Sequence, residues 1–317
     1  MKARASFRML VLVALLLGAC EEPFTPKGPF LDRTVVFSLL SARSDTAFVR
    51  VYRTYYPPHD DPYEVDWETP DTSAQVVISD GTRSIALNDT VLTRADNSTV
   101  HSYLAYPFHI EPGATYTLNV TTSGHEEVSS STIVPGEGSV LIQNPAALSD
   151  LQKYLQDDIW MEVTLSLQAA GYIPRLTVEF QVVSTGAVLE REVPLVLRTP
   201  DDENKNPVYP DIMRTETAPK GPFVITYSLH AYAYTLRKIK EDFGEVYFRR
   251  AHCSLVQTDQ ALYLYYNIAN GFRDSYSIRM DHPDYSNIEG GLGVFGSFNL
   301  DEKWYYLPSH ISIPLSL

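Results

Sequence analysis

The sequence predicts a mostly β protein: an N-terminal immunoglobulin-like β-sandwich followed by a second β-rich domain with one or two short helices. Three observations predict this class. Short runs of β-branched and aromatic residues alternate with polar residues along most of the chain, which is the period of a strand with one buried face. Turn residues separate these runs at the intervals of a sandwich. The chain has 317 residues, of which 44% are apolar, enough for about two domains.

Residues 1–19 have the features of a lipoprotein signal peptide. Three basic residues precede the apolar run Met9–Ala19, which is far shorter than the roughly 20 residues that cross a bilayer. Leu17-Gly18-Ala19-Cys20 then matches the bacterial lipobox, in which small residues precede the lipidated cysteine. We predict that Cys20 is acylated and holds the mature protein in a membrane, because two or more acyl chains give stable anchoring.

After the signal we expect a tether and then the sandwich. Residues 20–33 hold several prolines and a glycine, which suits a short extended tether. Residues 34–136 are predicted to form the sandwich, with Asp80-Gly81 as the turn of a two-residue hairpin. The Cys-Trp-Cys core of antibody domains is absent, so only the general architecture is implied. The predicted strands are 34–41, 48–54, 75–79, 83–87, 101–106, 115–121 and 128–134.

Residues 137–317 are predicted to form the second β-rich domain. A short helix is expected at 146–157. A longer one is expected at 259–270, with Thr258 as its N-cap and Gly271 in the left-handed position after its last turn. The predicted strands here are 160–167, 175–183, 188–197, 223–233, 247–257 and 293–300.

The charge balance excludes one class of partner. The chain carries 25 Lys and Arg against 39 Asp and Glu, a formal net charge of −14. Nucleic-acid binding needs a basic face that displaces counterions, so no nucleic-acid partner is expected.

No motif selects a cofactor, a metal or a catalytic centre. Residues 291–296 (GLGVFG) match G-x-G-x-x-G, but too little chain follows for a βαβ unit, so we expect a glycine-rich bend that leads into a strand. The acidic loop that begins at His59 lacks the spacing of an EF-hand and is interpreted as solvated. With Cys20 lipidated, Cys253 is a lone cysteine and is expected to be a small buried residue.

The segment from Arg53 to Trp67 (RTYYPPHDDPYEVDW) is the predicted contact site for a partner or ligand. Its prolines lower the entropy lost on binding, and Tyr and Trp are enriched at interface hot spots. The alternative is that these rings fold back to cover the sandwich core. The aromatic residues concerned are Tyr55, Tyr56, Tyr63 and Trp67.

Three stretches together resemble a family of Bacteroidota lipoproteins, the domain of unknown function 4249 family. They are residues 20–24 (CEEPF), 113–118 (GATYTL) and 286–296 (SNIEGGLGVFG). The resemblance implies an outer-membrane lipoprotein, often encoded beside a TonB-dependent receptor, and it carries no catalytic residues. Glu21 and Glu22 look like the acidic signal that directs lipoproteins of this phylum to the cell surface.

Three functions follow as hypotheses, and a non-catalytic role is favoured. The first is an accessory role beside a TonB-dependent receptor in nutrient uptake, with the protein anchored in the outer membrane and exposed at the surface. The second is a surface glycan- or protein-binding module of the adhesin type. The third is a cell-surface hydrolase whose site is assembled from loops. The sequence does not identify a small-molecule or glycan ligand.

Overall fold

The computed structural model describes residues 30–54, 70–94, 96–198, 206–270 and 285–314; side chains of 268–270 are left out of the description. Strands predominate, and two α-helices lie within the described ranges. The prediction of a mostly β protein with one or two helices is therefore confirmed, while the immunoglobulin-like arrangement stays a prediction. The predicted signal peptide lies outside the described residues. None of the described helices is long and apolar enough to cross a membrane.

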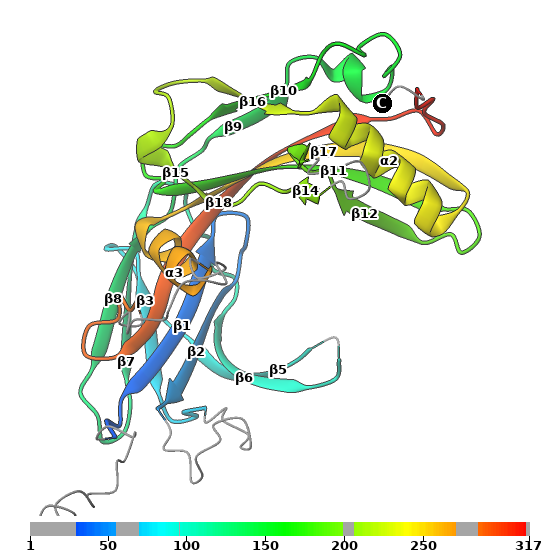
Figure 1. Cartoon of the computed structure of the whole chain (residues 1–317). Helices are drawn as coiled ribbons and strands as arrows, with labels where there is room; N and C mark the ends of the chain where they lie inside the picture. Colours follow the sequence, from blue (N-terminus) through cyan, green and yellow to red (C-terminus); the bar gives the residue numbers. More distant parts are fainter. Residues whose placement is uncertain (1–29, 55–69, 95, 199–205, 271–284, 315–317) are drawn as a thin grey trace, which may run out of the picture.

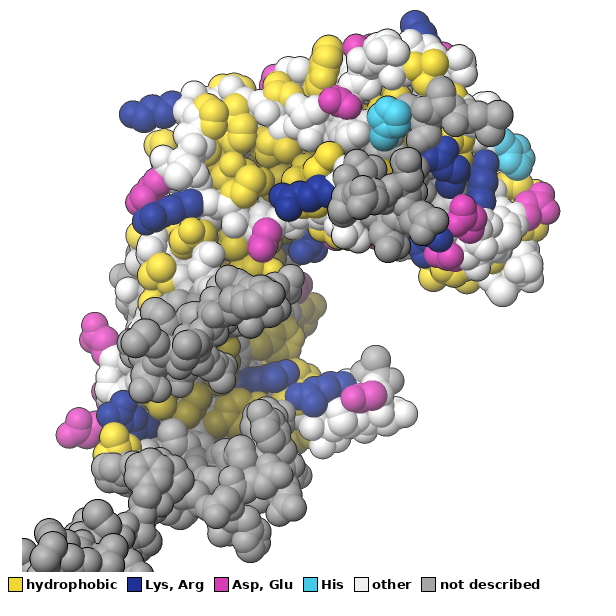
Figure 2. Space-filling model, in the orientation of Figure 1, with side chains coloured by type: hydrophobic (Ala, Val, Ile, Leu, Met, Phe, Trp, Pro, Cys, Tyr) yellow, Lys and Arg dark blue, Asp and Glu magenta, His cyan; other side chains and the backbone are white. Residues whose placement is uncertain are grey.

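One large sheet runs through the whole molecule (Figure 1). Its strand order is β12-β11-β17-β18-β1-β2-β6-β5, and β15 pairs with the end of β11. The hairpin β5–β6 stands out from the body, and Figure 2 shows an open hollow between it and the C-terminal half. The strands of this sheet are β1 (Thr34–Ser41), β2 (Ala47–Arg53), β5 (Asn88–Thr93), β6 (Thr99–Ala105), β11 (Gly171–Val182), β12 (Val188–Glu192), β15 (Met213–Arg214), β17 (Val246–Thr258) and β18 (Leu292–Tyr306).

A four-stranded sheet packs against the N-terminal part of the large sheet. Its order is β4-β3-β7-β8, formed by β3 (Gln75–Ser79), β4 (Ser84–Ala86), β7 (Thr115–Thr121) and β8 (Val128–Ile133). Alternate side chains of β3, β7 and β8 face inward and are buried. The resulting core includes Val36, Val49, Ile78, Tyr116 and Leu118, together with Ile288 and Phe295 from the C-terminal stretch.

A second core lies in the C-terminal half. Here β11 and β17 are covered by helix α2 (Leu229–Phe243) and by the three-stranded sheet β16-β10-β9, with bounds Phe223–Tyr227, Ile159–Thr164 and Ser139–Ile142. A small two-stranded sheet joins β13 (Val196–Arg198) to β14 (Asn206–Val208). Figure 1 shows α2 lying across this half. The largest fully buried side chains of this core are Tyr227, Tyr232, Phe180 and Phe248.

Strand β18 connects the two halves. Its first part pairs in parallel with β1, from Leu292 beside Val35 to Phe298 beside Ser41. Its second part pairs antiparallel with β17, from Phe298 to Tyr306. Strand β18 therefore completes a sandwich whose first strand, β1, lies more than 250 residues earlier in the sequence. Both cores depend on β18.

Most predicted strands are confirmed, but the expected strand at 223–233 is half wrong. It ends at Tyr227, and α2 begins two residues later. Leu229, Tyr232, Leu236 and Ile239 are buried at helical spacing, so burial of this stripe overrides the alternation that precedes it.

The helix predicted at 259–270 is confirmed as α3 (Gln260–Asn270), with a different cap. Asp259, rather than Thr258, accepts a hydrogen bond from the backbone N–H of Leu262 at 2.9 Å. The helix predicted at 146–157 is reduced to a short 3-10 turn, Pro145–Leu148. Further turns follow it up to residue 156. The Asn144 side chain joins the two ends of this segment, because it donates to the carbonyl of Asp158 and accepts from the N–H of Trp160.

Candidate functional site

All the residues that the sequence singled out as sites lie outside the described residues: the lipidation site Cys20 and the aromatic contacts Tyr55, Tyr56, Tyr63 and Trp67. Their roles stay predictions. The structure does describe the residues on either side of the predicted contact segment, at the end of β2 and from Pro70 onward.

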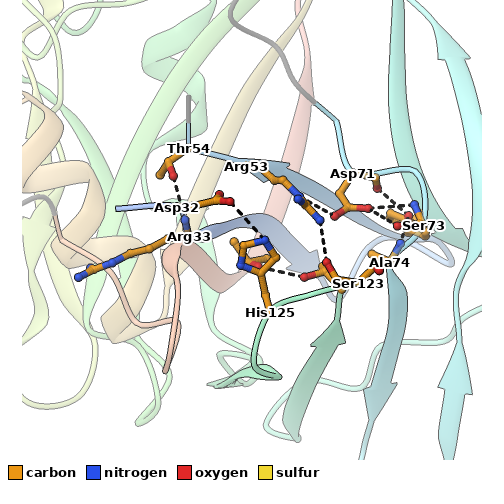
Figure 3. A network of polar contacts seen from close by, with 12 residues as sticks. Asp32, Arg33, Arg53, Thr54, Asp71, Ser73, Ala74, Ser123 and His125 are labelled. Carbon is orange, nitrogen blue, oxygen red and sulfur yellow. Dashed lines mark hydrogen bonds and ion pairs between the residues drawn. The ribbon is translucent and has the colours of Figure 1, made fainter. Parts of the chain in front are cut away.

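These two flanks are joined by four residues that we call the stem clamp: Arg53, Asp71, Ser73 and Tyr103. Figure 3 shows Arg53, Asp71 and Ser73. The Asp71 carboxylate accepts hydrogen bonds from Arg53 Nε at 3.1 Å and from the Ser73 backbone N–H and hydroxyl at 3.0 and 2.8 Å. Burial disfavours ionisation of Asp71, but the hydrogen bonds from Ser73 and Arg53 outweigh it, so the pKa lies below its ordinary value. Asp71 is therefore ionised at neutral pH and forms an ion pair with Arg53.

Tyr103 fastens the clamp to the sandwich core. Its buried hydroxyl donates to the carbonyl of Asp71 at 2.7 Å and accepts from the N–H of Ala74 at 2.9 Å. On the other side, Arg53 Nη2 donates to the carbonyl of Ser123 at 3.0 Å. Sequence reasoning missed this arrangement because its members lie in four separate stretches of the chain.

The chain that enters β1 is bound at the same end of the sandwich. The Thr54 hydroxyl donates to the carbonyl of Leu31 at 2.8 Å and accepts from the N–H of Arg33 at 2.9 Å. The Asp32 carboxylate lies 3.6 Å from His125 Nε2 (Figure 3). The described residues that flank the predicted contact segment, and those at the end of the predicted tether, therefore lie at the same end of the sandwich.

The glycine motif is structural. A strand begins there, as predicted, and the motif opens no helix. Cβ atoms at Gly291 and Gly293 would run into the backbone of β1, and one at Gly296 would meet Leu262 and Asp259 of the α3 N-terminus. The glycines thus permit the backbone of β18 to pack closely against its neighbours. This is the geometry of two paired strands and not that of a phosphate-binding loop.

Cys253 is a core residue, as predicted. It is fully buried on β17, and burial raises the pKa of its thiol to about 12. Its neighbour His252 lies on the other face of the sheet, where it stacks on Trp304 with ring centroids 3.8 Å apart. The pair is therefore not a nucleophile and base.

A polar cavity of about 440 Å³ lies between the edge strand β12 and α2. Figure 2 shows acidic and basic side chains interspersed over this region. Tyr234, Lys238 and Asp242 are spaced four residues apart on α2 and so share one face of the helix. We call it the β12–α2 cavity; its lining residues are Arg191, Glu192, Tyr209, Tyr234, Thr235, Lys238 and Asp242.

The charged groups of this cavity are held in place by neighbours. Arg191 Nη1 lies 2.7 Å from Asp242 Oδ2, and its guanidinium lies 5.5 Å from the centroid of the Phe243 ring. Lys238 pairs with Glu241 at 2.9 Å. Glu192 lies 3.6 Å from Arg175, and burial raises the pKa of its carboxyl.

The cavity is suited to binding a small polar molecule. It combines two tyrosine rings with several fixed polar groups and has the volume of a small-ligand site. Within the described ranges no group of three or more His, Cys, Asp or Glu side chains could hold a metal ion. Sequence reasoning missed the cavity because the start of α2, up to Ala233, was expected to be a strand and the rest of the helix was assigned no element; the spacing of Tyr234, Lys238 and Asp242 was the available signal.

The fold defines the class of protein: a β protein with two hydrophobic cores that share strand β18. The chain belongs to the family described as Domain of unknown function (DUF4249), whose model matches residues 21–303. This confirms the family suggested by the resemblance. No protein with a curated description matches the chain.

One solved structure with some similarity is the C-terminal globular domain of an oligosaccharyltransferase from Pyrococcus abyssi. It shares 9% identity with this chain at a TM-score of 0.22. The match covers 89% of this chain and 50% of that one, so the chain spans half the length of that protein.

Proposed function

We propose that this protein is a Bacteroidota outer-membrane lipoprotein, exposed at the cell surface, with a non-catalytic binding or accessory role beside a TonB-dependent receptor. The observation that carries the proposal is the lipobox at Leu17–Cys20 behind a short apolar run. Glu21 and Glu22 directly after the cysteine support the surface location. Membership in the family supports the assignment, since the resemblance to its lipoproteins includes this same stretch.

The hydrogen bonds that hold the start of the described chain to Thr54 support a partner that lies in the membrane. Residues 21–29 separate Cys20 from Phe30, the first described residue, and a fully extended chain between these two residues covers at most about 36 Å. A lipid at Cys20 would therefore keep the clamped end of the sandwich close to the bilayer. A receptor embedded in the same membrane would then lie within reach of the predicted contact segment.

The anchor is tested by the variant Cys20→Ser. We expect the variant to keep its signal peptide or to appear in the soluble fraction, because serine has no thiol to form the thioether. Membrane fractionation and intact mass measure this outcome. A variant that is processed normally and stays with the outer membrane would exclude anchoring through Cys20.

Surface exposure is tested with protease added to intact cells. We expect the protein to be degraded while a periplasmic control protein survives. Survival until the outer membrane is opened would show instead that the fold faces the periplasm.

The accessory role is tested by affinity purification from detergent-solubilised outer membranes. We expect a TonB-dependent receptor to be enriched relative to a purification of an unrelated lipoprotein. If no receptor is enriched and the purified protein binds a polysaccharide by itself, the glycan-binding alternative is correct; the β12–α2 cavity is the observation that favours that alternative.

A further inference from the structure

We propose that the β12–α2 cavity binds a neutral saccharide, an inference that rests on the binding role proposed above and names its ligand class. A saccharide presents many hydroxyl groups around a ring whose C–H faces are apolar. A site for it needs aromatic surface together with donors and acceptors fixed in place. The cavity has both, and its volume of about 440 Å³ is that of a small-ligand site.

The aromatic surface comes from Tyr209 and Tyr234. Tyr209 follows β14 and is 46% exposed, and both rings line the cavity. A tyrosine offers a flat apolar face and a polar tip, so it can pack against the C–H face of a sugar while its hydroxyl bonds to a sugar hydroxyl. Burial and the charge of Glu192 raise the pKa of Tyr209, so its hydroxyl keeps its proton and remains a donor.

The fixed donors come from Arg191. Its Nη1 atom donates to Asp242 at 2.7 Å, and its Cζ atom lies 5.5 Å from the centroid of the Phe243 ring. A guanidinium has five N–H donors, so this ion pair positions the group and still leaves donors for a ligand. A side chain that is already held by such a pair loses less entropy when a ligand binds.

The acceptor is Glu192. Among the described residues its one charged partner is Arg175, and 3.6 Å is too long for a strong hydrogen bond. Burial raises the pKa of Glu192, and the charge of Arg175 offsets only part of this shift. A ligand hydroxyl would donate a hydrogen bond to this half-buried carboxylate.

The charge of the cavity selects a neutral ligand. Its lining holds two cations, Arg191 and Lys238, and two carboxylates, Glu192 and Asp242. Arg191 is paired with Asp242, and Lys238 is paired with Glu241. Glu192 lies 3.6 Å from Arg175. Each cation and each carboxylate of the lining therefore has an opposite charge beside it, so the cavity offers neither a free cation to a phosphate nor a free carboxylate to an amine.

A second hollow of similar size provides a matched control. It measures about 430 Å³ on the outer face of β7 and β8 and is lined by Thr117, Asn119, Ser129, Ser130, Ser131, Asn287 and Glu289. It has hydroxyl and amide groups but no aromatic ring. The proposal therefore predicts that substitutions there leave saccharide binding unchanged.

The experiment uses the full lipoprotein purified in detergent. Native gels containing starch, xylan, mannan or galactan detect binding by retardation, and titration with oligosaccharides of the retarding polymer gives the Kd. We expect at least one polymer to retard the protein.

Tyr209→Ala and Glu192→Gln should each weaken binding about tenfold, equal to about 1.4 kcal/mol. Asn119→Ala should bind like the wild type. Melting temperatures within about 2 °C of the wild type would show that the variants are folded, and Tyr209→Phe provides a milder second variant.

Three outcomes would overturn the inference: no retardation by any of the four polymers, unchanged affinity in both cavity variants, or equal loss in Asn119→Ala. Binding of spermidine or inorganic phosphate in the cavity, abolished by Glu192→Gln or Tyr209→Ala, would also overturn it. If the receptor still co-purifies while saccharide binding fails, only the ligand class is wrong. If both fail, the proposed binding role is wrong.

Discussion

Replacing Gly293 by alanine is expected to destabilise both halves of the molecule strongly. Gly293 has a φ of 112°, a conformation that favours glycine, and an added Cβ would overlap the carbonyl oxygen of Val36. Relief would require β1 and β18 to separate, yet their parallel pairing runs over seven residue pairs and carries Phe295 into the core. We expect a loss of about 4 kcal/mol or more in the free energy of unfolding. Urea denaturation followed by circular dichroism measures this loss.

Gly81→Ala is the matched control for Gly293→Ala. Gly81 also has a positive φ, 86°, but no heavy atom lies within 4 Å of the position of an added Cβ. Only the cost of the left-handed conformation remains, about 1–2 kcal/mol. Equal losses in the two variants would show that backbone conformation alone explains the effect, and that the close approach of β1 and β18 contributes nothing.

Local patterns explain which parts of the fold the sequence could predict. The strands Thr34–Ser41, Gln75–Ser79 and Thr115–Thr121 have the expected bounds because each buries one face and exposes the other. The helix after Asp259 was also predictable, since a capping residue and an apolar stripe are signals within one short segment.

Contacts between distant segments explain what could not be predicted. Nothing local in the residues of β18 shows that this strand lies parallel to β1, more than 250 residues away. The stem clamp unites Arg53, Asp71 and Tyr103, and the β12–α2 cavity unites Glu192, Tyr209 and Tyr234. The contact site predicted from aromatic residues such as Tyr55 and Trp67 lies outside the described ranges, so it stays a prediction.

Asp259 is the second residue whose substitution is expected to have a large effect. Its carboxylate caps α3 by accepting from the Leu262 N–H at 2.9 Å, and it accepts from the Thr132 hydroxyl at 2.6 Å. Thr132 in turn lies 2.7 Å from the Ser297 hydroxyl, which donates to the carbonyl of Ile133 at 3.0 Å. The carboxylate therefore links β8, β18 and α3, elements that are far apart in the sequence.

Asp259→Ala is expected to reduce the free energy of unfolding by about 3 kcal/mol, because it removes the cap and leaves buried hydrogen-bonding groups unsatisfied. Asp259→Asn should lose less than about 1 kcal/mol, since its oxygen can still cap α3 and its amide can donate to Thr132. Urea denaturation of the three proteins at pH 7 measures the difference. Equal destabilisation by Ala and Asn would mean that the negative charge, rather than the hydrogen bonding, is what the fold requires.

The pH dependence of stability gives an independent test of the same residue. Burial raises the pKa of Asp259 above its ordinary value of 3.8, although the hydrogen bond from Thr132 opposes the shift. Between 3.8 and the raised pKa, the folded state binds more protons at this carboxyl than the unfolded state does. The contribution of Asp259 to the free energy of unfolding must therefore fall as the pH rises through this window. Asp259→Asn has no proton to lose, so the stability of the wild type relative to this variant should decline from pH 4 to pH 7. A constant difference between the two proteins over this range would show that Asp259 ionises in the folded protein as easily as it does in water.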